Sequence, residues 1–162
     1  MTASDDKIEA LLQRVDELES RAALRDLVSD YCLGFDNHDR DRFMSIWHDD
    51  AVWEIGPPFG TFTGHAEIIR AVDEILYPFW RETHHLTTNL RLNFSDVDHA
   101  HGMSNCDCMG ASKEGDIVQI VNASYADDFV RRDGIWKIAR RKVELHFFNP
   151  LPGVEMSAPE SA

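Results

Sequence analysis

The chain has 162 residues, of which 43% are hydrophobic and 28% charged, so it can form one packed domain. Its formal net charge of -13 argues against nucleic acids or anionic membranes as partners, because both require a basic surface. The polar N-terminus lacks the pattern of a secretion signal, no apolar run reaches the length of a membrane span, and the three cysteines show no disulfide-framework spacing. We therefore expect a cytoplasmic protein.

The first predicted element is a long amphipathic helix from about Asp5 to Asp36. Apolar residues recur there at steps of three and four, first as Ile8, Leu11, Leu12, Val15 and Leu18, and then as Leu24, Leu27, Val28 and Tyr31. Because the stretch is long for one helix of a globular domain, we expect a break or a change of packing partner between Glu19 and Ala22. This predicts a helical extension at 1–19, a single domain at 20–153 and a loose tail at 154–162.

The remaining pattern predicts an α+β fold. Short helices are expected at 39–47 and 66–79, a strand at 51–56, a Pro- and Gly-rich turn region at 57–64, and strands at 85–94, 102–112, 116–131 and 135–148. Helices first and a run of long strands later indicate a curved antiparallel sheet with helices folded over one face.

The last predicted strand carries an arginine that faces apolar neighbours. Strict alternation places Arg141 on one face together with Lys137, Ala139, Val143, Leu145 and Phe147. An arginine that points toward an apolar interior needs an acceptor. The residue is therefore either half of a structural ion pair or oligomer contact, or part of a functional site.

The segment "WRETHHLTTNLRLNF" contains two adjacent histidines, His84 and His85, on opposite faces of a predicted strand. A lone histidine is more often structural than catalytic, but a carboxylate partner holds its tautomer and raises its basicity. Asp36, at the end of the first helix, is the candidate partner. Tyr31 can reach the same cavity if the helix ends near Gly34. The alternative is that Tyr31 is a core aromatic and Asp36 caps the next helix.

The sequence offers little support for a bound cofactor. His101, Cys106 and Cys108 together suggest zinc only weakly, because no second ligand pair with finger or ribbon spacing is present. A cysteine nucleophile has equally little support. No Gly-x-Gly-x-x-Gly, Walker or Gly-x-Ser-x-Gly motif occurs. We expect neither a metal nor a nucleotide cofactor.

Four stretches in the same order carry a family resemblance: "SRAALRDLVSDYCLGFDNHD", "SIWHDDAVWEI", "ETHHLTTNLRL" and "RRDGIWKI". Together they resemble the SnoaL-like branch of the nuclear transport factor 2-like superfamily, from about Ser20 to Gly153. The resemblance is closest to the γ-hexachlorocyclohexane dehydrochlorinase group, with bile-acid 7α-dehydratase and scytalone dehydratase as relatives. It implies a cone-shaped α+β barrel and a homo-oligomer, by family resemblance a trimer.

The resemblance also implies roles for individual residues. A histidine that removes a proton corresponds to His85, the aspartate that orients it to Asp36, and an arginine in the last strand to Arg141. Where the dehydrochlorinases carry an amide or a lysine, this chain has Tyr31, as the dehydratases do. That departure favours loss of water over loss of halide.

Taken together, these residues predict a cofactor-independent lyase that acts on a small, apolar cyclic substrate. His85 and Asp36 would form the base, and Tyr31 and Arg141 would assist the leaving group or an enolate oxygen. One alternative is an isomerase or aldolase-type proton transfer at the same site. The other is a ligand-binding module without catalysis, because one fold often serves both enzymes and binding proteins.

Overall fold

The computed structural model describes residues 3–115 and 117–156, and the last residues of the predicted tail, 157–162, lie outside this range. The helical elements are α1 (Ala3–Asp36), α2 (Arg40–Ser45), α3 (Gly64–Ala71), a π-helical segment (Val72–Leu76) and α4 (Tyr77–Phe79). The strands are β1 (Trp47–Gly56), β2 (Gly60–Thr63), β3 (Trp80–Phe94), β4 (His99–Ser112), β5 (Val118–Arg132) and β6 (Ile135–Pro150). None of the described helices has the length and low polarity needed to cross a membrane.

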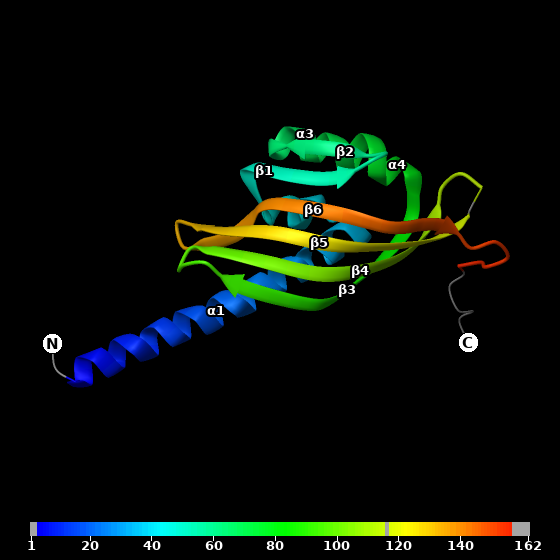
Figure 1. The fold of residues 1–162 in the computed structure, drawn as a ribbon. Coiled ribbons are helices and arrows are strands. Elements are labelled where there is room, and N and C mark those ends of the chain that lie inside the picture. The colour runs from blue at the N-terminus through cyan, green and yellow to red at the C-terminus, as the bar shows by residue number, and fades with distance from the viewer. Residues whose placement is uncertain (1–2, 116, 157–162) are drawn as a thin grey trace, which may run out of the picture.

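Within the described residues, the strands form one open, curved sheet of six strands in the order β2-β1-β6-β5-β4-β3 (Figure 1). The α+β class is as expected, and strands β3 to β6 pair antiparallel with long ladders. The expected all-antiparallel sheet is wrong at one seam, because β1 pairs parallel with β6. The helical connection at 64–79 separates β1 and β2 from the later strands and so leaves β1 free to run beside β6 in the same direction. The predicted turn region contains β2, which sequence reasoning missed.

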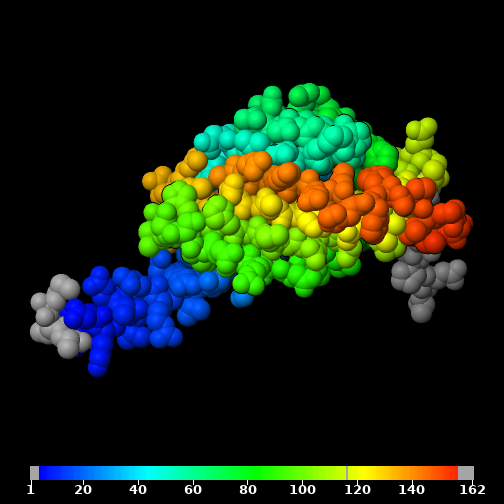
Figure 2. Space-filling model, in the orientation of Figure 1, coloured from blue at the N-terminus to red at the C-terminus, as the bar shows by residue number. Residues whose placement is uncertain are grey.

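Helix α1 runs without a break from Ala3 to Asp36, so the expected break near Glu19 is absent, although the burial of the helix does change there. From Ser4 to Glu19 its side chains are exposed or nearly so, and Ser20 is the first buried one after them. The other expected alternative, a change in packing, agrees with the structure: Leu18 is 65% exposed, whereas Leu24 is fully buried. Figures 1 and 2 show the first half of α1 projecting beyond the sheet.

The second half of α1 covers the concave face of the sheet and builds the core with α2 and α3. Its buried residues pack with the aromatic side chains of Phe43, Trp47 and Trp53. Tyr31 lies among these rings, with its centroid 5.2 Å from that of Phe43. A continuous aromatic core therefore ends at the cavity described below.

Two irregularities in β6 change which side chains face the core. The register with β5 shifts between Asp128 and Phe129, which leaves Ala139 as an extra residue, and shifts again near His146. Each bulge reverses the alternation. Trp136 and Ile138 therefore face inward on one side of the first bulge, and Arg141 faces inward on the other. The expected inward position of Arg141 is confirmed, but the strict alternation over the whole strand is wrong.

Candidate functional site

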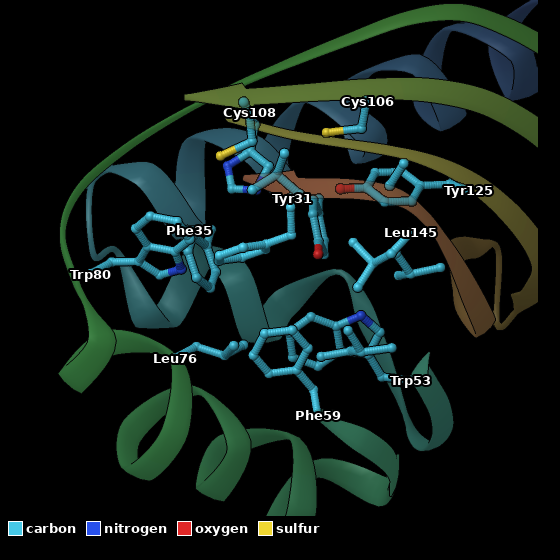
Figure 3. A pocket seen from close by; sticks show the side chains of 16 residues that line it. Tyr31, Phe35, Trp53, Phe59, Leu76, Trp80, Cys106, Cys108, Tyr125 and Leu145 are labelled. Atoms are coloured by element: carbon cyan, nitrogen blue, oxygen red, sulfur yellow. The ribbon is translucent and has the colours of Figure 1, made fainter. Parts of the chain in front are cut away.

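A cavity with largely apolar walls lies between the concave face of the sheet and the helices (Figure 3). The cavity itself has a volume of about 80 Å³. The aromatic walls come from Phe35, Trp53, Phe59, Trp80 and Phe148, and the aliphatic walls from Ile55, Leu76, Val121, Val143 and Leu145. The polar lining groups are His85, Tyr31, Tyr125, Cys106 and Cys108.

His85 and Asp36 form a close pair at the wall of this cavity. The Nδ1 atom of His85 lies 2.6 Å from Oδ1 of Asp36, and the backbone N–H of His85 donates to Oδ2 at 2.7 Å. The hydroxyl of Thr83, itself buried, donates to Oδ1 at 2.8 Å. The carboxylate thus accepts three hydrogen bonds that fix its orientation. Because Nδ1 donates to Asp36, the lone pair of the neutral imidazole resides on Nε2, where it can accept a proton.

The end of α1 places Asp36 opposite β3. A Cβ atom on Gly34 would come within 2.7 Å of the backbone nitrogen of Phe43, so only glycine lets α2 cross this close to α1. His38 adopts a positive φ of 53° and ends the helical path, and the Asp39 side chain caps α2 by accepting from the N–H of Arg42. Asp36 therefore lies in the last turn of α1, and Asp39 is the cap of α2. The alternative that Asp36 is the cap is wrong.

The surroundings of Asp36 favour its charged form. Burial disfavours the carboxylate, but the hydrogen bonds and charge of His85, together with the Thr83 hydroxyl, outweigh burial and hold the pKa of Asp36 below its usual range. The Asp36 side chain is 15% exposed and that of His85 is 12% exposed. Asp36 is therefore ionised at neutral pH and can stabilise a positive charge that develops on the imidazole.

Tyr31 faces the same cavity from one helical turn further back. Its ring centroid is 6.2 Å from that of His85, and Figure 3 shows the phenol oxygens of Tyr31 and Tyr125 turned into the cavity. Burial raises the pKa of the Tyr31 phenol far above its usual range, against the opposing charge of Arg141. The phenol therefore stays protonated at neutral pH and can act as a hydrogen-bond donor.

Arg141 is fully buried and does not belong to the cavity wall that the described residues form. Its Nε and Nη2 atoms donate to the two carboxylate oxygens of Asp127 at 2.7 and 2.8 Å. The guanidinium also lies between the rings of Tyr31 and Tyr125, 4.2 and 4.3 Å from their centroids. Its Nη1 atom has no hydrogen-bond partner among the described residues. Arg141 is thus placed behind the two phenols.

Sequence reasoning missed Asp127 and Tyr125. Both lie on β5 in the alternating set Ala123, Tyr125, Asp127 and Phe129, all of which are buried. An acidic residue in an inward-facing alternating set is the signal that could have identified the acceptor that Arg141 requires. Thr83 was missed as well, although it stands two residues before His85 on the same face of β3.

The two adjacent histidines have different surroundings. The His84 side chain is 61% exposed and its Nε2 atom lies 2.9 Å from Glu82 on the outer side of β3. His85 alone of this pair reaches Asp36 and the cavity. Of the two histidines, His85 is therefore the one that lies at the cavity wall.

The three side chains that weakly suggested zinc face opposite sides of β4. His101 is exposed and bonds Asp128, whereas Cys106 and Cys108 are buried on the concave side. These three side chains cannot bind one ion, and no cluster of three or more suitable ligands occurs among residues 3–115 and 117–156. Burial raises the pKa of the Cys106 thiol to about 11 and that of Cys108 above its usual range. Both are protonated at neutral pH, which makes them poor nucleophiles.

Residues 16–142 match the model of the SnoaL-like domain family, and the chain belongs to that family. It is 37% identical over 145 residues to hexachlorocyclohexane dehydrochlorinase 1 from Sphingobium indicum, covering 90% of this chain and 94% of the relative. It is 36% identical over 145 residues to a γ-hexachlorocyclohexane dehydrochlorinase from the same species, covering 90% of this chain and 92% of that one.

Solved structures agree with this assignment. A type 2 hexachlorocyclohexane dehydrochlorinase superposes with a TM-score of 0.87 at 36% identity, over 91% of this chain and 99% of the other. A scytalone dehydratase-like protein from Novosphingobium aromaticivorans superposes with a TM-score of 0.77 at 21% identity, over 92% and 99%. The second likeness concerns the fold alone. The expected family and the nuclear transport factor 2-like fold are thus confirmed.

Proposed function

We propose that the protein is a cofactor-independent lyase that eliminates a leaving group from a small, largely apolar ring. The observation that carries this proposal is the imidazole of His85 at the wall of an apolar cavity, held by a 2.6 Å contact with the ionised Asp36. The relatives at 36–37% identity are named as dehydrochlorinases, which are elimination enzymes, and this supports the reaction class.

The reaction begins when Nε2 of His85 accepts a proton from a ring carbon. The electron pair of that C–H bond forms the new double bond, and the bond to the leaving group on the adjacent carbon breaks. Asp36 stabilises the imidazolium as it forms and holds the ring in place. An oriented base of this kind contributes about 10²–10⁴-fold to the rate.

Tyr31 is the proposed donor to the leaving group. Hydroxide leaves poorly without a hydrogen bond, which the protonated phenol at the cavity can donate, and the proton that His85 has taken then converts the departing hydroxide into water. Arg141 acts through Tyr31, because its charge lies 4.2 Å from the centre of that ring. Asp127 is then a positioning residue, since it engages two of the arginine nitrogens. Water is the leaving group that this arrangement favours.

Dehydrochlorination is the second candidate, because the relatives carry that activity in their names. Chloride leaves without a proton, so it depends less on Tyr31.

The body of the protein is proposed to assemble as a homo-oligomer, by family resemblance a trimer. The exposed side chains of Leu86, Met103 and Met109 on the convex face of the sheet support self-association there.

A substrate panel tests the proposal. Purified protein is given cyclic β-hydroxy ketones and halogenated cyclohexanes, and ring alkenes and released halide are measured. Alkene without halide supports dehydration, and alkene with stoichiometric halide supports dehydrochlorination. Rearranged isomers without a released group would indicate an isomerase. Tight binding of panel members with no product from any of them would contradict the lyase and favour a binding module.

A further inference from the structure

The first half of α1 presents an apolar stripe that nothing in the described chain covers. Five side chains share this property, with exposed fractions of 48% to 65%: Ile8, Leu11, Leu12, Val15 and Leu18. Figure 2 shows this part of the helix standing clear of the rest of the molecule. Five large apolar residues on one projecting helix exceed the scattered exposure that a monomer surface normally shows.

Four of the five residues are directed away from the protein's own domain, whereas Leu12, at the edge of the stripe, lines a hollow with Phe94 and Val97. At about 100° per residue, the buried residues Ser20, Leu24 and Leu27 lie on roughly the opposite side of α1 from Ile8 and Val15. The domain-facing side is also tied down, because the Arg131 guanidinium donates to Asp16 at 2.7 and 3.1 Å. The stripe therefore cannot be covered by its own chain without breaking these contacts.

The spacing of the stripe is that of a coiled coil. With Ile8 at position a of a seven-residue repeat, Val15 is the next a position, and Leu11 and Leu18 fall at d. β-branched residues at a combined with leucine at d favour two parallel strands. The buried residues Ser20, Leu24 and Leu27 fall at c and f, the positions outside such a seam. One face of the helix is thus available for pairing with a second copy, and a different face packs on the domain.

The charges that flank the stripe suit a parallel pair of identical helices. Arg14 occupies position g and Glu19 the following e position, which meet across the seam of a parallel dimer. Neither residue makes an ion pair within the part of the chain that the structure describes. Each of two copies can therefore offer an arginine to the other copy's glutamate.

We propose that the segment from about Asp5 to Arg21 forms a two-stranded parallel coiled coil with the same segment of a second copy of this chain, a copy that belongs to another of the proposed oligomers. The seam is short, at little more than two repeats, and a free peptide of this length would be marginally helical. Here the helix is already formed, because its second half is fixed in the core. Pairing therefore costs little conformational entropy. We expect a weak contact whose population depends on the protein concentration.

Cross-linking of the full chain tests the contact directly. Leu11→Cys places a thiol at d, where it faces its counterpart, and Ala10→Cys places one at the outward c position. The native cysteines are buried, at 2% to 8% exposure. Mild oxidation should convert nearly all of Leu11→Cys into a covalent dimer and little of Ala10→Cys. An equal yield of covalent dimer from both variants, or no covalent dimer from Leu11→Cys, would overturn the proposal. A yield that stops at two-thirds would contradict the two-stranded form.

Charge reversal tests the register. Arg14→Glu should raise the concentration of half-association, measured by analytical ultracentrifugation, by about tenfold, and the double variant Arg14→Glu with Glu19→Arg should restore it. Leu11→Asp with Leu18→Asp should abolish the contact, whereas the matched pair Ala10→Asp with Gln13→Asp should not. All these side chains are exposed, so each variant should keep the thermal unfolding midpoint of the wild type. Association that is unchanged in the Leu11, Leu18 variant would also overturn the proposal.

Discussion

Two inward-facing pairs of opposite or potentially opposite charge occur in the part of the chain that the structure describes, and the two pairs have different surroundings. The His85 and Asp36 side chains keep 12% and 15% of their surface exposed, and His85 lines the cavity. The Arg141 and Asp127 side chains are both 0% exposed, and the arginine lies behind two tyrosine rings. A ligand in the cavity can therefore reach the His85 and Asp36 pair, whereas the Arg141 and Asp127 pair can only support the cavity wall.

The difference teaches that an inward charge in the sequence is not enough to assign a catalytic role. Both pairs sit on the concave side of the same sheet, and their partners are 49 residues apart in the first pair and 14 in the second. A fully buried pair is costly to break but contributes little net stability compared with apolar replacements. Removing one partner should therefore affect turnover in the first pair and folding in the second.

The largest expected effect is on turnover at the His85 pair. His85→Ala and Asp36→Asn should each lower kcat by at least about 100-fold, because both act on the same proton. His84→Ala is the matched control, since its side chain is exposed and bonds Glu82 instead. Steady-state kinetics with a substrate from the panel, together with thermal melting to verify the fold, measures this. Near-normal kcat in either dyad variant would contradict the assignment.

The next effect is on the stability of the buried pair. Asp127→Leu and Arg141→Met each strand one buried charge or leave buried donors unpaired, and each should lower the free energy of unfolding by about 3–5 kcal/mol. Urea unfolding measures the loss.

The double variant Asp127→Leu with Arg141→Met sharpens the comparison, because it removes both charges. It should recover most of the lost stability. Purely additive losses in the double variant would show that the two side chains do not act as a pair.

Tyr31 stands between the two pairs, and its variant should lower turnover without unfolding the protein. Tyr31→Phe removes only the hydroxyl and keeps the ring that Arg141 stacks on. We expect kcat to fall by about tenfold with a hydroxylated substrate, and less with a chlorinated one, since chloride needs no proton. An equal loss of kcat with both substrates would show that the Tyr31 hydroxyl does not act on the leaving group. Binding constants measured by calorimetry should change little.

The smallest expected effect is the acid dependence of stability. Because the pKa of Asp36 is lowered by folding, its contribution is fully present above the usual aspartate pKa of about 4 and is lost as pH falls through the folded value. The loss should be on the order of 1 kcal/mol. Urea unfolding between pH 7 and pH 3 should show a shallower decline in Asp36→Asn than in wild type. Parallel curves would mean that Asp36 does not contribute in this way.

The sequence predicted His85 and Asp36 as the reactive pair because each carries a local signal, and the structure places the two side chains in contact. Asp36 ends a long amphipathic helix, and His85 stands on a β-rich segment with a clear family motif. Asp127 was not identified, because its role depends on pairing between β5 and β6. The bulge at Ala139, which turns Trp136 and Arg141 to the same side, has no marker in the local sequence.

The same limit applies to α1 and to the cavity. Periodicity predicted the helix, but it could not show that Leu18 is exposed while Leu24 is buried, because burial depends on where the sheet ends. The cavity walls combine distant residues such as Phe59, Trp80 and Phe148, and only the fold brings these together. Local pattern thus predicts elements and reactive residue types, and the packing of the elements decides which of these residues share a site.

The most direct test of the central claim is solvent deuterium exchange at the ring carbon that loses its proton. A cyclic ketone without a leaving group is incubated in deuterated buffer with wild type, His85→Ala or His84→Ala, and incorporation is followed by NMR. The account predicts rapid exchange with wild type and His84→Ala, and exchange at the uncatalysed rate with His85→Ala. Equal exchange with all three proteins, or none above background with wild type while the ketone is bound, would contradict it.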